Sequence, residues 1–238
     1  MAGRHTAKYL PESDIEAEAL CLLAEYGRKF GAVTQPPVPV EQILEAHLGL
    51  TLDLDDLPAL IEQAGVLGAT CVQERRILID QSLDPSVFPA KLGRYRFTVA
   101  HELGHWVLHR HAFLEDPAQG RLFDGHLKPA IVCRSGSKER VEWQADCFAG
   151  HLLMPKDMAL AAWREAHGSL EPYIAADELA DLNARWGLAE DSRPTVKVAR
   201  DLARQFDVSG QAMQIRLVGL GLVRTTKPEP DLFAVPNN

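Results

Sequence analysis

The sequence predicts an α+β domain that is mainly helical and contains a small antiparallel or mixed sheet. Two segments with apolar residues at helical spacing, 95–109 and 138–154, indicate buried helices. Residues 65–80 contain two β-type runs on either side of the polar turn 73–76 and are typical of a hairpin. A basic segment at 193–227 indicates a further helical extension near the C-terminus.

The N-terminal third is expected to form two helices and one strand. Apolar residues at helical spacing predict a helix over 15–26. A second helix is predicted over 40–48, with Gly49 ending it. The alternation at 50–54 predicts a strand, which would complete a small sheet with the hairpin.

The second half is expected to alternate between helices and one long irregular segment. Residues 112–136 are interrupted by prolines and glycines, and a loop of that length is often a lid or a binding segment. Helices are predicted after it over 138–154, 157–167 and 175–187.

Composition excludes several classes of protein. The net charge of −8 disfavours generic nucleic-acid binding, because phosphates repel an acidic surface. No apolar run resembles a signal peptide or approaches the roughly 18 residues of a membrane span. The cysteines are far apart and form no C-x-x-C pair, so we expect a reduced, cytoplasmic protein without membrane contact.

The segment HELGH at 101–105 matches the pattern H-E-x-x-H. Residues four apart on a helix share one face, so the imidazoles of His101 and His105 can hold one Zn²⁺ together. Glu102 lies one position further round the helix. Its carboxylate can therefore reach a water on the metal and act as the general base.

A catalytic zinc site needs a third protein ligand and leaves its fourth position to water. No H-x-x-G-x-x-H extension follows His105, so the three-histidine version of the motif is absent. Glu142 is the preferred ligand, because it lies on a predicted helix beside the apolar stripe. Asp146, one turn further on, can accept from the free N–H of a ligand imidazole. The downstream candidates are Glu115, Asp116, Asp124, His126, Glu139, Glu142, Asp146 and His151.

His109 continues the face of His101 and His105 by one more turn. Two interpretations stay open for it. It could contact the substrate or a ligand side chain, or it could simply be packed at the end of the helix.

Two segments resemble the ImmA/IrrE metallopeptidases. Residues 96–109 (RFTVAHELGHWVLH) resemble the active helix of that family, and residues 142–155 (EWQADCFAGHLLMP) resemble its second signature. The resemblance implies a zincin-like (thermolysin-like) fold, with the two histidines of HELGH and Glu142 as Zn²⁺ ligands and Glu102 as base. It also implies a protein partner, an Xre-type helix-turn-helix repressor. Cleavage or inactivation of that repressor would derepress stress or mobile-element genes.

The segment 193–227 holds seven basic and two acidic residues, a net charge of +5 in an acidic protein. Its pattern predicts a helix, a turn with Ser209 as cap, and a second helix, which resembles the helix-turn-helix-like extension of many family members. The sequence therefore predicts a zinc metallopeptidase domain at 1–190 and an extension at 191–238.

Two other functions remain open. The protein could be a DNA-binding regulator that uses 193–227, or a binder that sequesters its repressor without cutting it. In either case the metal site would not be catalytic. The apolar residues of the extension favour packing against the rest of the protein, so direct DNA binding is the weaker expectation.

Overall fold

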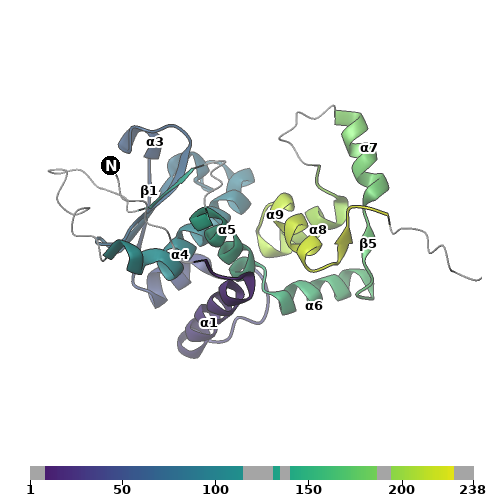
Figure 1. Ribbon diagram of the computed structural model, residues 1–238, viewed down its shortest axis with the longest axis horizontal. Helices are drawn as coiled ribbons and strands as arrows, with labels where there is room; N and C mark the ends of the chain where they lie inside the picture. Colours follow the sequence, from purple (N-terminus) through teal and green to yellow (C-terminus); the bar gives the residue numbers. More distant parts are fainter. Residues whose placement is uncertain (1–8, 115–130, 135–139, 187–193, 228–238) are drawn as a thin grey trace, which may run out of the picture.

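A computed structural model describes residues 9–114, 131–134, 140–186 and 194–227 (Figure 1). In this part of the chain the fold is α+β, mostly helical with a small sheet, as the sequence predicts. No helix among the described residues is both long enough and apolar enough to cross a membrane.

The N-terminal half supplies the sheet and the first helices. The elements in chain order are α1 (Glu12–Phe30), α2 (Val40–Gln42), the π-helical turn Ile43–His47, β1 (Thr51–Asp55), α3 (Leu57–Leu60), β2 (Val66–Cys71) and β3 (Arg76–Asp80). Two short 3₁₀ turns, Gln81–Leu83 and Pro89–Lys91, lead into α4 (Leu92–Leu114). The two predicted helices, the strand and the hairpin are all present.

The sheet is mixed and has the strand order β1-β3-β2-β4. β1 is parallel to β3, and β2 is antiparallel to both β3 and β4. The expectation that 112–136 is irregular is wrong at two points, because α4 continues to Leu114 and β4 (Ile131–Arg134) lies inside that segment. Four residues contain too few alternations to identify a strand, and β4 forms because the edge of β2 offers hydrogen bonds.

Helix α4 is the centre of the domain. One side packs on β2 and β3, and another packs along α5 (Arg140–Leu153), beside which it lies in Figure 1. The apolar residues of α4 are therefore buried on more than one side of the helix. Val99 and Leu103 are fully buried, whereas Phe97 and Val107 are half-buried. A helix covered on several sides does not show the single apolar face of a surface helix.

The remaining elements gather beyond α5, on the right of Figure 1. They are α6 (Lys156–His167), β5 (Tyr173–Ile174), α7 (Ala176–Trp186), α8 (Lys197–Phe206), α9 (Gly210–Gly219) and β6 (Val223–Arg224). The Ser209 hydroxyl caps α9 by accepting from the backbone N–H of Ala212 at 3.1 Å, as the sequence predicts. β5 pairs in parallel with β6, and Leu202 and Leu217 belong to the same apolar core as α4 and α5. A domain boundary at residue 190 stays a prediction.

Candidate metal centre

The close approach of α4 and α5 builds the site. A Cβ on Gly104 would lie 3.2 Å from the Cα and carbonyl oxygen of Ala145 and 3.2 Å from the Cβ of Phe148. Gly104 thus makes room for α5, and with it Glu142, directly opposite the histidines. The position that a Cβ of residue 104 would occupy faces α5, so a residue without a side chain is needed here for the two helices to pack closely.

Three donor groups converge between these helices. The Nε2 atoms of His101 and His105 are 2.9 Å apart, and the Glu142 carboxylate oxygens lie 3.3 Å and 3.4 Å from them. Ligands around a tetrahedral zinc ion are separated by about 3.3 Å when the bonds are roughly 2.0–2.1 Å long. The donors are at most 10% exposed. Their types and spacing fit a single divalent cation.

The ionisation states suit a cation as well. Burial raises the pKa of Glu142, but its close contacts with the imidazoles of His101 and His105 outweigh burial and lower that pKa to about 2. Burial lowers the pKa of His105 to about 4. Near neutral pH the site therefore presents a carboxylate and a neutral imidazole, the forms that bind metals.

The outer nitrogens of both histidines are also held. Asp146 Oδ1 accepts from His101 Nδ1 at 2.8 Å, so Nε2 of His101 keeps its lone pair for the centre. His105 Nδ1 lies 3.1 Å from His109 Nδ1, and His109 Nε2 lies 2.8 Å from Gln144 Oε1. An amide oxygen only accepts, so His109 donates to Gln144 and accepts from His105. These two hydrogen bonds place the proton of His105 on Nδ1 and leave the lone pair on Nε2.

His109 is 3% exposed and contacts His105, so it lies behind the histidine pair and away from solvent. That placement favours the interpretation in which it orients a ligand imidazole. Substrate contact would require an open face that the described residues around it do not leave.

Glu102 is fully buried between α4 and β2. Thr70 donates to its Oε2 at 2.7 Å, whereas no described residue hydrogen-bonds its Oε1. Burial raises the pKa of Glu102 to about 7. A buried carboxylate with one unsatisfied oxygen and a pKa near neutrality is suited to accept and release a proton.

Gly68 of β2 is required by the position of Glu102. A Cβ at residue 68 would lie 2.8 Å from Cγ and 2.9 Å from Cδ of Glu102 and would overlap its carboxylate. We expect Gly68→Ala to displace Glu102, to slow any reaction that depends on this carboxylate about tenfold or more, and to destabilise the fold by about 1–3 kcal/mol. Gly150→Ala is the matched control, because nothing lies within 4 Å of a Cβ there. Equal activity and equal unfolding midpoints for both variants would contradict this placement.

The raised pKa of Glu102 predicts that ionisation of this carboxyl lowers the free energy of unfolding of the metal-free protein. Below its ordinary value of 4.5 the carboxyl is protonated in both folded and unfolded chains, and above about 7 it is ionised in both. Stability is therefore lost as pH rises between these values. Glu102→Gln has no ionisable group at this position and avoids this loss. The free energy of unfolding of the variant minus that of the wild type should therefore be about 2 kcal/mol larger at pH 8 than at pH 5. Denaturant unfolding of chelated protein measures this, and an equal difference at both pH values would rule it out.

The Asp146 contact predicts a loss of metal affinity without loss of a ligand. Asp146→Ala leaves Nδ1 of His101 without this acceptor and should weaken zinc binding about 10–100-fold. Competition with a fluorescent zinc chelator measures the affinity. Asp181→Ala, an exposed carboxylate on α7, is the control. Identical affinities for the two variants would show that the contact does not orient His101.

The sequence did not single out Gly68, Thr70 or Gln144. Gly68 and Thr70 alternate along β2 and face Glu102 together, a pattern that strand periodicity allows but does not make distinctive. Gln144 gives no signal, because its partner His109 lies 35 residues away.

Other candidates do not join the centre or cannot be placed. Glu115, Asp116, Asp124, His126 and Glu139 lie outside the described residues. His151 contacts Glu12 of α1. The Tyr173 hydroxyl lies on β5, away from this centre (Figure 1), and donates to Glu178 on α7.

Two histidines and a carboxylate around one point, beside a buried glutamate, define the class of site: a mononuclear centre of the kind that hydrolases use. Residues 72–218, well over half of the 238-residue chain, match the family Peptidase_M78, described as the IrrE N-terminal-like domain. The chain belongs to this peptidase family, which confirms the ImmA/IrrE resemblance. No curated protein matches the chain.

Proposed function

We propose that the protein is a zincin-like metalloendopeptidase in which His101, His105 and Glu142 bind Zn²⁺ and Glu102 is the general base. The observation that carries the proposal is the convergence of the three donors beside the unsatisfied Oε1 of Glu102. Membership of a peptidase family supports it independently.

The chain's own residues account for the proton transfers. Bound zinc would lower the pKa of a water and polarise the scissile carbonyl. Glu102 takes a proton from the attacking water and later gives one to the leaving amine, which its pKa near neutrality permits. Thr70 fixes Oε2 of Glu102, so that Oε1 is the oxygen available for the transfer. Asp146 and His109 hold the two imidazoles in the required tautomer.

The proposed substrate is a helix-turn-helix repressor of the Xre type. The similarity of 96–109 and 142–155 to the ImmA/IrrE signatures, together with the family match, supports this partner. Cleavage in the cytoplasm would relieve repression of stress or mobile-element genes.

Co-incubation with an Xre-type repressor encoded next to this protein, followed by mass measurement, tests the substrate. We expect two fragments whose masses add up to that of the repressor plus one water. A chelator should stop the cleavage, and added zinc should restore it. Intact repressor in a stoichiometric complex under all conditions would instead support sequestration without cleavage.

The alternative of DNA binding is favoured by the net charge of +5 of the segment 193–227 and by the three-residue turn between α8 and α9. The charges of this segment are, however, largely engaged. Lys197 and Arg204 both pair with Asp201. Arg216, a cation on α9, is nearly buried and donates to the carbonyl of Met154. Salt-dependent binding of the protein to operator DNA would support the alternative.

A further inference from the structure

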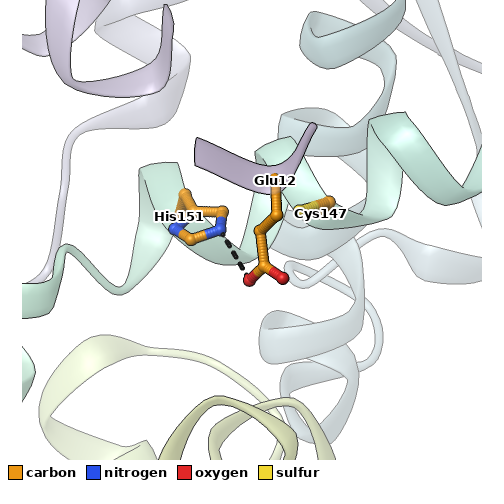
Figure 2. A group of neighbouring side chains, drawn as sticks. All are labelled: Glu12, Cys147 and His151. Atoms are coloured by element: carbon orange, nitrogen blue, oxygen red, sulfur yellow. Dashed lines mark hydrogen bonds and ion pairs between the residues drawn. The ribbon is translucent and has the colours of Figure 1, made fainter. Parts of the chain in front are cut away.

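A second group of possible metal ligands lies on the opposite side of α5. Glu12, Cys147 and His151 bring a carboxylate, a thiol and an imidazole within 4.8 Å of one another (Figure 2). Helical geometry of about 100° per residue puts Cys147 and His151 roughly 140–180° away from Glu142 around α5. The group is therefore separate from the centre between α4 and α5.

The imidazole of His151 is buried and oriented. Its side chain is 5% exposed, and Nε2 lies 3.2 Å from Oε1 of Glu12. Its other nitrogen, Nδ1, lies 3.4 Å from Oε1 of Glu16, although the angle does not make a hydrogen bond. Arg216 lies 3.5 Å from the same oxygen of Glu16. A carboxylate behind the outer nitrogen is the usual arrangement for a histidine that binds metal through its inner one.

The group opens on a cavity of about 860 Å³ between α1, α4, α5 and α9. All three side chains line this cavity, as do Arg216 and Trp143. An ion can therefore reach them from outside, and there is room for a water or an external ligand at a remaining coordination position.

An ion pair between two helices is the simpler explanation for part of this arrangement. Glu12 lies in the first turn of α1, where a carboxylate stabilises the helix, and pairing with His151 ties α1 to α5. That explanation covers the two charged groups, whereas the Cys147 thiol beside them packs partly buried against the apolar core. Cys147 is not a reactive nucleophile beside a histidine, because burial raises the pKa of its thiol to about 11.

We propose that Glu12, Cys147 and His151 form a second metal site, selective for zinc or a similar borderline cation. Thiolate and imidazole donors suit such ions, whereas Mg²⁺ and Ca²⁺ require oxygen ligands. Binding forms a metal–sulfur bond, and the Cys147 proton leaves to solvent. The bound ion joins the start of α1 to α5, so it stabilises the packing of these two helices against each other.

Cobalt(II) titration distinguishes the two sites, because only the second contains a thiolate. The full-length protein should bind two Co²⁺ ions and develop a near-ultraviolet thiolate-to-cobalt charge-transfer band. Cys147→Ser should bind one ion without the band. Glu142→Ala should bind one ion and keep the band, so failure of the first site is recognised separately. Cys21→Ser, an exposed thiol on α1, is the control and should behave like the wild type.

Glu12→Gln provides a second variant. Its side chain is 65% exposed, so the substitution should not disturb folding. It should weaken the site that gives the band at least about tenfold. Absence of the band in the wild type, or its persistence in Cys147→Ser, would overturn the proposal.

Discussion

Glu102→Gln should lower peptide hydrolysis by about 10²–10⁴-fold while the protein keeps its metal. The amide fills the same buried space against Thr70 but can neither take a proton from water nor return one to the leaving amine. Because Glu102 is not among the three converging donors, zinc stoichiometry should equal that of the wild type. Turnover of a quenched peptide from the repressor, with metal content measured on the same samples, checks both expectations.

Glu165→Gln, a change to an exposed carboxylate on α6, is the control for loss of one negative charge. Activity of Glu102→Gln within a fewfold of the wild type would mean that another group transfers the proton. Loss of zinc together with activity would mean that Glu102 is a ligand.

Glu142→Ala should remove both metal and activity. It deletes the only carboxylate among the three donors and leaves two imidazoles to hold the cation. We expect zinc affinity to fall about a hundredfold or more, because each ligand carries a substantial share of the binding free energy. Isothermal titration with zinc measures the affinity, in a Cys147→Ser background so that only this centre is observed.

The two variants separate ligand from base. A protein without Glu142 should regain measurable activity at high zinc concentration, since its general base is intact. A protein without Glu102 should not respond to added zinc. If both recover, or if Glu142→Ala binds zinc as tightly as the wild type, the assignment of the third ligand is wrong.

The histidines and Glu102 could be located from the sequence because their spacing is local. Four residues along one helix fix the relative positions of His101 and His105 whatever the rest of the chain does. Glu142 and Asp146 lie on another helix, α5. The sequence favoured them as ligand and supporting residue because they lie one turn apart on a predicted helix. The structure brings both to His101.

The residues that support these groups are fixed by contacts between distant segments. Thr70 reaches Glu102 across 32 residues, and Gly68 matters only because β2 runs beside α4. The strand β4 has the same origin, since its four residues become a strand by pairing with β2. A single sequence does not show which distant segments will pair, so these contacts could not be predicted from it.

Helix packing also explains why the buried residues of α4 do not lie on one face. A periodic apolar stripe describes a helix with one buried face, but α4 is enclosed by the sheet and by α5. Gly104 is small because α5 approaches it, and the same approach puts Glu142 within reach of the histidines. The Ser209 cap and the apolar positions of α8 and α9 could be predicted from the sequence, because they are local features.

A crystal structure of the zinc-loaded protein, with anomalous diffraction recorded at the zinc edge, tests the central claim most directly. Between α4 and α5 we expect an anomalous peak bonded to Nε2 of His101, Nε2 of His105 and the carboxylate of Glu142, with Glu102 close by but not coordinated. An empty position between α4 and α5, or a peak there that Glu102 ligates in place of Glu142, would contradict it.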